Sequence, residues 1–179
     1  AYRVWAVDFG YVNPLVWQDW AVDGDGRMVL VDEIYRTSLL VEDLCREVQA
    51  GAAVARWIVC DHDAEGRATL ERHLGRRTVR ANKSVLDGIN AVKSRLRSDS
   101  LRRPFLVLQT GLPRARDPHL EEARLPCSTA EEFDGYVWDT TAGRRRGDAP
   151  LKEHDHGMDA LRYAVAQVDG LGKRQVRVY

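Results

Sequence analysis

The sequence is poor in cysteine and lacks any long hydrophobic run. Its three cysteines, Cys45, Cys60 and Cys127, are far apart and show no CxxC spacing, so they support neither a disulfide framework nor a zinc site. This usage favours a reducing compartment. No stretch of about 18 apolar residues is present, so no transmembrane helix and no membrane partner are predicted. The chain starts with a strand-like segment rather than a signal peptide, and because its first residue is not Met we expect a fragment or a processed chain.

An excess of charge of one sign is also missing. Lysine plus arginine and aspartate plus glutamate both number 27, so the formal net charge of the 179 residues is zero. The charge balance alone therefore does not indicate a nucleic-acid partner, and any basic surface must be local. This length, with 44% hydrophobic residues, predicts one globular domain with a real core.

Apolar alternation and turn residues predict a mixed α/β fold. An antiparallel three-strand meander is predicted from three β-prone segments, at residues 3–7, 15–22 and 27–35. A DGDG hairpin turn at 23–26 joins the last two. Further strands are expected at 57–60, 77–81 and 105–108, and helices at 38–51, 64–74, 84–96, 129–136 and 154–168. Residues 111–126 are expected to be mostly loop. The alternation of strands and helices in the rest of the chain predicts parallel strands that extend this sheet and helices that flank it. Residues 1–169 form the predicted domain, and 170–179 a basic, flexible tail.

The last predicted helix, residues 154–168, concentrates acidic side chains on one side. A helix turns by about 100° per residue, so its apolar side chains share an arc of about 80°. That arc holds Met158, Leu161, Val165 and Val168, and the opposite arc holds Asp155, His156, Asp159, Arg162 and Tyr163. An acidic face held against a core by an apolar back is suited to presenting metal ligands.

Two further carboxylates follow predicted strands. Asp8 ends the first strand and Asp61 follows the fourth, so they lie side by side if these strands are neighbours, and Asp159 can project toward the same edge. Three clustered carboxylates repel one another, and protonation or a cation relieves the repulsion. Hard oxygen ligands favour Mg²⁺ or Mn²⁺. Two such ions about 3.5–4 Å apart activate water and stabilise the leaving oxygen in phosphodiester cleavage.

Each of these residues also has a plainer interpretation. Taken singly, Asp8 or Asp61 is typical of a turn or cap after a strand. Asp155 is expected to cap the last helix, and a lone His156 is more typical of a surface or capping histidine than of a ligand. Asp63 competes with Asp61 for the second acidic position, and Asp61 is preferred because it directly follows the strand.

Five motifs together resemble a known family. They are DFG with a following NP (residues 8–10 and 13–14), VCD (59–61), KSVLDGI (83–89), YVWD (136–139) and DHGMDALRY (155–163). In this combination the chain, from residue 3 to about 168, resembles the nuclease domain of the large terminase subunit of tailed bacteriophages. The last motif is the most specific of the five, whereas a lone DxG is not specific.

The resemblance implies an RNase H-like fold over residues 1–169 and a metal-dependent DNA endonuclease that cuts concatemeric viral DNA during genome packaging. By motif, Asp8, Asp61 and Asp159 match the catalytic acids that hold two Mg²⁺ or Mn²⁺ ions, and His156 matches a position beside or on a metal. The implied partners are double-stranded DNA, the packaging ATPase domain of the same full-length protein, the small terminase subunit and the portal, in the host cell cytoplasm. No GxxxxGK[ST] phosphate loop occurs in this sequence, so we interpret it as the nuclease part alone.

A nuclease with little sequence preference needs cations that contact DNA phosphates. The first choice is the basic loop before the last helix, with Lys152 close to the acidic face and two lysines further away as weaker choices. The full set is Arg144, Arg145, Arg146, Lys152, Lys83 and Lys93. A solvated charge run is the plainer interpretation of the arginines.

Other functions remain open from the sequence alone. Another RNase H-like nuclease, such as a junction resolvase or RNase H, would use the same acids on a different nucleic acid. A non-catalytic DNA-binding or docking module would bind duplex DNA with steep salt dependence but without cleavage. An actin-like ATPase fits the DxG turn but is disfavoured because a second glycine-rich phosphate motif is missing.

Overall fold

The computed structural model describes residues 1–97, 104–139 and 149–171. The Arg144, Arg145 and Arg146 loop and the tail from residue 172 lie outside the described residues. The described strands are β1 (Tyr2–Asp8), β2 (Leu15–Val22), β3 (Met28–Arg36), β4 (Trp57–Cys60), β5 (Val79–Arg80) and β6 (Leu106–Leu108). The helices are α1 (Val41–Gly51), α2 (Ala64–Leu74), α3 (Val85–Leu96), α4 (Pro118–Glu122), α5 (Thr129–Glu132) and α6 (His156–Val168).

The described strands form one mixed sheet in the order β5-β4-β1-β2-β3-β6. Strands β1, β2 and β3 are an antiparallel meander, while β4 and β5 on one side and β6 on the other pair in parallel. The Asp23 side chain closes the β2–β3 turn by accepting from the backbone N–H groups of Asp25 and Arg27, and Gly26 supplies the positive φ. The predicted fold class is confirmed.

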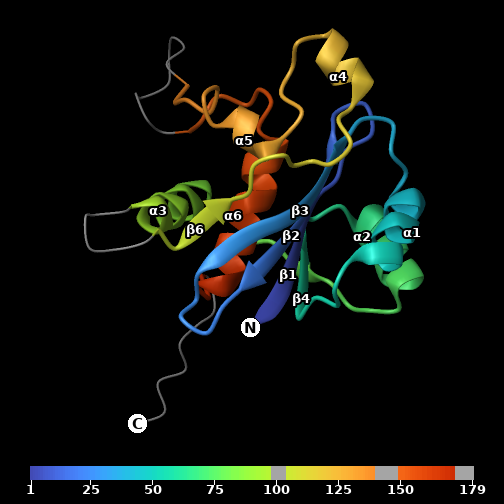
Figure 1. Ribbon diagram of the computed structural model, residues 1–179, viewed down its shortest axis with the longest axis horizontal. Coiled ribbons are helices and arrows are strands. Elements are labelled where there is room, and N and C mark those ends of the chain that lie inside the picture. The colour runs from blue at the N-terminus through green and yellow to red at the C-terminus, as the bar shows by residue number, and fades with distance from the viewer. Residues whose placement is uncertain (98–103, 140–148, 172–179) are drawn as a thin grey trace.

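Residue alternation along β1 divides the core between the two faces of the sheet. Val4 and Ala6 pack in the hydrophobic cluster that includes α6, whereas Trp5 and Val7 pack in the cluster that includes α1 and α2. Figure 1 shows this layering, with α6 and α3 on one side of the sheet and α1 and α2 on the other. Because side chains alternate, Asp8 has the orientation of Val4 and Ala6 and faces α6.

Helix α6 is more deeply buried than its sequence pattern predicts. The wheel assigned Arg162 and Tyr163 to the arc opposite the core, yet their side chains lie in the interior, with 3% and 6% of each residue exposed. Helix α6 contacts β1, β2 and β4 on one side and α3 and α5 on others. The acidic arc therefore lies inside the molecule, at the edge of the sheet, because α3 and α5 cover parts of α6 that the helical wheel predicts to face solvent.

Some predicted helix bounds and caps are wrong. Residues 111–126, which were predicted to be mostly loop, contain the short helix α4. The Asp117 carboxylate caps this helix by accepting a hydrogen bond from the N–H of His119 at 2.8 Å, and Pro118 lies in its first turn. The helix predicted at 38–51 begins at Val41, with Leu40 at its N-cap position, and Ser38 lies before it with a positive φ. The predicted helix at 129–136 ends at Glu132. None of the described helices is long and apolar enough to cross a membrane.

Candidate active site

Asp8 and Asp61 meet because β1 and β4 are parallel neighbours. Val7 lies opposite Cys60 in the ladder, and the N–H of Asp61 donates to the carbonyl oxygen of Val7 at 3.2 Å. The next residue along β1 is Asp8, so the two carboxylates follow adjacent strand positions at the same end of the sheet. The premise that these strands are neighbours is confirmed.

Helix α6 brings three more side chains to this edge. The Nδ1 atom of His156 lies 3.1 Å from Oδ2 of Asp8, and the hydroxyl of Tyr163 donates to Oδ1 of the same carboxylate at 3.4 Å. Asp159 lies in the first turn of α6, near enough for its charge to act on Asp8. We call Asp8, Asp61 and Asp159 the edge cluster.

Burial and the neighbouring carboxylates disfavour the charged form of Asp8. Burial raises the pKa of Asp8 to about 6; the hydrogen bond to His156 opposes this rise. The negative charges of Asp159 and Asp61 add to it. Burial lowers the pKa of His156, but its hydrogen bond to Asp8 and the charge of Asp8 outweigh burial and leave that pKa raised. The imidazole therefore compensates the charge of Asp8.

Two cations hold Asp159. Its Oδ1 atom accepts a short hydrogen bond from the buried guanidinium of Arg162, and its Oδ2 atom lies 3.2 Å from the Lys152 ammonium nitrogen. Among the described residues, no three His, Cys, Asp or Glu side chains converge on one cation position. Both oxygens of Asp159 face cationic side chains.

The two neighbouring aspartates have local roles. The Asp63 side chain begins α2 by accepting from the N–H of Glu65 at 3.1 Å. Asp155 occupies the N-cap position of α6, as expected, but its side chain makes no capping hydrogen bond there. Instead its Oδ2 atom accepts from Lys152 at 2.8 Å. The capping prediction is therefore correct for the position of Asp155 and wrong for its side chain.

Sequence reasoning missed the carboxylate that caps α6. Glu132, at the end of α5, is 1% exposed and accepts from the N–H groups of Gly157 at 2.9 Å and Met158 at 2.7 Å. The Tyr35 hydroxyl donates to the same carboxylate at 2.6 Å. A negative charge at a helix N-terminus is favourable because free N–H groups point at it. Glu132 thus holds the turn that carries His156.

A second buried acid supports this arrangement from β3. Glu33 accepts from the N–H of Thr129 at 3.1 Å and from its hydroxyl, and the Gln18 amide donates to the Thr129 hydroxyl oxygen at 2.6 Å. Gln18 also donates to the carbonyl oxygen of Gly157 at 2.9 Å. A Cβ atom on Gly157 would lie 2.3 Å from the Thr129 hydroxyl, so α5 can approach α6 this closely only at glycine. We call Gln18, Glu33, Tyr35, Thr129 and Glu132 the buried network.

The predicted DNA-binding cations fall in different places. Lys152 contacts Asp159, as described above, and Lys83 precedes α3 on the surface. The Lys93 ammonium lies over the Trp138 ring, 5.4 Å from its centroid, on the α3 side of α6. The arginine loop at 144–146 lies outside the described residues, so its DNA-binding role stays a prediction.

The sequence matches no protein-family model and no curated relative. Solved structures are similar in fold. The large terminase of a thermophilic bacteriophage is 25% identical with a TM-score of 0.67 over 93% of this chain. The nuclease domain of the large terminase from bacteriophage SPP1, with bound Mn, is 19% identical with a TM-score of 0.64, also over 93% of this chain. The P22 large terminase nuclease domain is 19% identical with a TM-score of 0.62 over 94%.

The extent of these matches differs between the neighbours. The chain spans 39% of the large terminase from the thermophilic phage, but 86% of the SPP1 domain and 81% of the P22 domain. The matched region therefore corresponds in extent to a nuclease domain. The resemblance found in the sequence motifs and the likeness in three dimensions point to the same proteins. The chain has the RNase H-like fold of large-terminase nuclease domains.

Proposed function

We propose that this chain is a metal-dependent DNA endonuclease of the large-terminase type, which cuts concatemeric viral DNA during genome packaging. The observation that carries the proposal is that Asp8 and Asp61 lie at the same end of parallel neighbouring strands, while α6 brings Asp159 near enough for its charge to act on Asp8. The fold shared with the SPP1 and P22 nuclease domains supports the same function. A buried carboxyl such as Asp8, whose pKa is raised by burial and by neighbouring carboxylates, is typical of functional sites.

The donor set fits Mg²⁺ or Mn²⁺. Asp8, Asp61 and Asp159 offer hard carboxylate oxygens, which these ions prefer, and the SPP1 neighbour contains Mn. In the proposal two ions are held by these acids, with His156 as an auxiliary ligand. When bound, the ions supply the positive charge that activates water and stabilises the leaving oxygen in phosphodiester hydrolysis.

The surrounding side chains orient the acids. Tyr163 and His156 each hold one oxygen of Asp8, which fixes the plane of that carboxylate. Arg162 holds Asp159 from the interior, where it cannot reach substrate because it is 3% exposed. Lys152 has 59% of its side chain exposed, so it is the cation placed to contact a phosphate at the cluster.

Duplex DNA is the proposed substrate, and the packaging machinery supplies the proposed partners. These are a packaging ATPase domain in the same full-length protein, the small terminase subunit and the portal, in the host cell cytoplasm. The sequence described here contains no GxxxxGK[ST] loop, so the proposal assigns ATP-driven translocation to the ATPase domain.

Cleavage of supercoiled plasmid with Mn²⁺, compared with EDTA, tests the proposal. Asp61→Asn is expected to abolish nicking, because it removes one anionic oxygen from the cluster. Asp63→Asn is the matched control: it lies two residues away, and asparagine caps a helix about as well as aspartate, so nicking is expected to persist. Equal activity of the two variants would contradict the assignment of Asp61. Preference for a four-way junction or an RNA–DNA hybrid over linear duplex would redirect the function to a resolvase or an RNase H.

A further inference from the structure

A groove at the β4–β5 edge of the sheet opens beside the edge cluster. It has a volume of about 480 Å³ and lies between the residues that follow β5 and the second half of α6. Arg80, Asn82 and Lys83 line one wall, and Tyr163 and Gln167 of α6 line the other. The groove thus separates the edge strand from the helix that carries Asp159.

The groove is cationic, although the chain as a whole is neutral. No aspartate or glutamate is among its lining residues, whereas Arg80 and Lys83 are both exposed. Neither of these side chains forms a hydrogen bond or ion pair with another described residue. Their charges are therefore available to a ligand. Most other described cations are paired, for example Arg67 with Glu71 and Arg95 with Asp169.

The neutral groups of the groove add hydrogen-bond donors. The Oδ1 atom of Asn82 accepts from the N–H of Ser84 at 2.9 Å, which leaves the amide nitrogen of Asn82 for another partner. Gln167 contributes a second amide from α6. Two unpaired cations with amide donors and no carboxylate are suited to an anion with several oxygens, such as a phosphodiester.

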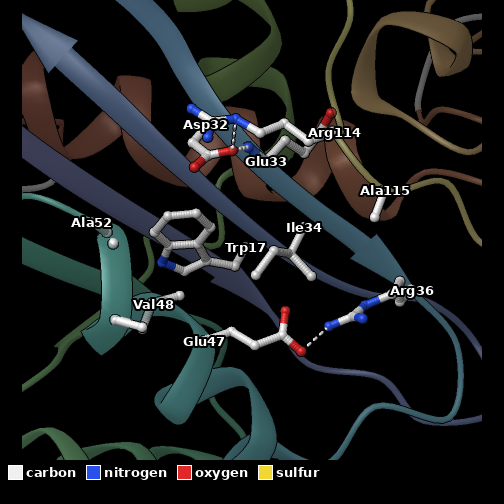
Figure 2. Close-up of a pocket in the computed structure, with 12 residues that line it drawn as sticks. Trp17, Asp32, Glu33, Ile34, Arg36, Glu47, Val48, Ala52, Arg114 and Ala115 are labelled. Carbon is white, nitrogen blue, oxygen red and sulfur yellow. Dashed lines mark hydrogen bonds and ion pairs between the residues drawn. The ribbon is translucent and has the colours of Figure 1, made fainter.

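Two other cavities differ in charge from this groove. Figure 2 shows the cavity on the opposite face of the sheet, where β3 faces α1. There Arg36 pairs with Glu47, and Arg114 lies 3.7 Å from Asp32, so each cation already has a carboxylate. The cavity beside Phe9 is lined by three acids, Glu42, Asp63 and Glu65, and by no lysine or arginine.

Tyr163 connects the groove to the edge cluster. Its ring lines the groove, and its hydroxyl donates to Oδ1 of Asp8 at 3.4 Å. His62, which also lines the groove, directly follows Asp61, and its Nδ1 atom lies 3.6 Å from that carboxylate. The groove therefore adjoins the carboxylates of Asp8 and Asp61.

We propose that this groove binds the phosphodiester backbone of the DNA strand next to the phosphate that is cut, with Arg80 and Lys83 as the principal contacts. The inference rests on the proposed nuclease function and extends it from the acids to a substrate subsite. Lys83 was a weak sequence prediction; the groove adds Arg80, Asn82 and Gln167 to it. Contacts of this kind position DNA without reading its sequence.

Fluorescence anisotropy of a labelled duplex, measured in EDTA, tests the groove separately from cleavage. The double variant Arg80→Ala/Lys83→Ala is expected to bind roughly tenfold more weakly and to lower the salt dependence by about two released counterions. Arg46→Ala/Arg72→Ala is the matched control, because it removes two exposed cations from α1 and α2 on the opposite face. The control is expected to bind like the unmodified protein.

Each outcome decides between the two proposals. Unchanged DNA affinity in the Arg80→Ala/Lys83→Ala variant would overturn the proposal that the groove binds DNA, even if the unmodified protein cuts DNA. Weakened binding in that variant, with no Mn²⁺-dependent nicking by the unmodified protein, would support the groove and contradict the nuclease. Inorganic phosphate or a mononucleotide that displaces the duplex at equal phosphate concentration would overturn the assignment to a DNA strand.

Discussion

Two groups of acidic residues flank the first turn of α6, and they differ in the kind of partner that stabilises their carboxylates. In the buried network, Glu132 accepts three hydrogen bonds from fixed donors: two helix N–H groups and the Tyr35 hydroxyl. In the edge cluster, Asp8 faces the charges of Asp61 and Asp159 and is compensated by His156. Fixed hydrogen-bond donors therefore stabilise the acids of the buried network, whereas cationic side chains compensate the charges of the edge cluster.

This difference separates a structural acid, Glu132, from the acids of the proposed active site. Burial raises the pKa of Glu132 to about 7, yet both of its oxygens already accept hydrogen bonds from groups that the fold holds in place. Asp61 and Asp159 lie at the edge, where Lys152, a largely exposed cation, is one of the partners. A mobile surface cation is replaceable by a ligand cation, and a backbone N–H is not. Burial alone therefore does not distinguish the proposed catalytic acids from Glu132, whereas the identity of their partners does.

Replacing Asp8 gives the largest expected effect and tests the functional side of the comparison. Asp8→Asn is expected to lower Mn²⁺-dependent nicking by about a thousandfold or more, since it removes a charge that the proposed mechanism requires. The same change is expected to raise the free energy of unfolding at pH 8 by about 1–2 kcal/mol, because the pKa of about 6 shows that charging Asp8 is unfavourable in the fold. Plasmid nicking and urea unfolding measure the two effects. A variant that loses both activity and stability would contradict the distinction.

Removing Glu132 tests the structural side. Glu132→Ala leaves two helix N–H groups and the Tyr35 hydroxyl without a buried partner, so the free energy of unfolding is expected to fall by about 3 kcal/mol. Urea unfolding followed by circular dichroism measures the loss. Glu122→Ala, at the exposed end of α4, is the matched control and is expected to change stability by less than about 0.5 kcal/mol. A loss of similar size in both variants would show that the Glu132 contacts contribute little.

The edge cluster was more predictable from the sequence than the buried network. Asp8 and Asp61 each follow a short apolar strand, so local patterns find them, and one assumption about strand order brings them together. Glu132 reaches the N–H groups of α6 across 25 residues, and no local pattern encodes that contact. Buried Gln18, which with Asp19 interrupts the apolar residues of β2, is a signal that the sequence offered and that the prediction did not use.

The helix wheel failed for a different physical reason. It divides a helix into a core side and a solvent side, but α6 is enclosed by the sheet, α3 and α5. Arg162 is therefore buried against Asp159 instead of facing water. In contrast, the local signal for α4 was present in Asp117 followed by Pro118, a cap and a first-turn proline, and was overlooked.

The pH dependence of stability sharpens the comparison within the buried network. Burial raises the pKa of Glu33 to about 7 in the fold, against 4.5 ordinarily, while its hydrogen bonds from Thr129 oppose the rise. The folded state then holds its proton more tightly than the unfolded state, so this contribution to stability is complete below about pH 4.5 and is lost as the pH rises to about 7. The expected loss is on the order of 2 kcal/mol between pH 5 and pH 8.

Glu33→Gln isolates that contribution, because glutamine does not titrate. Urea unfolding at pH 5 and pH 8 is expected to show a smaller difference for the variant than for the unmodified protein. Asp25→Asn, in the exposed β2–β3 turn, is the control and is expected to leave the pH dependence unchanged. The same pH dependence in Glu33→Gln would show that other acids, such as Asp8 or Glu132, account for all of it.

The smallest expected effect concerns the exposed cation of the edge cluster. The Lys152 ammonium lies 3.2 Å from Oδ2 of Asp159, the oxygen that the proposal assigns to a divalent cation, so we expect the two cations to compete for it. Lys152→Ala is expected to lower the Mn²⁺ concentration for half-maximal nicking by about twofold to fivefold, which corresponds to the roughly 0.2–1 kcal/mol of an exposed ion pair. Lys152→Arg keeps the charge and is expected to leave this concentration unchanged. If both variants require the same Mn²⁺ concentration as the unmodified protein, then Lys152 does not compete for Asp159, and the partners of the edge cluster are as fixed as those of the buried network.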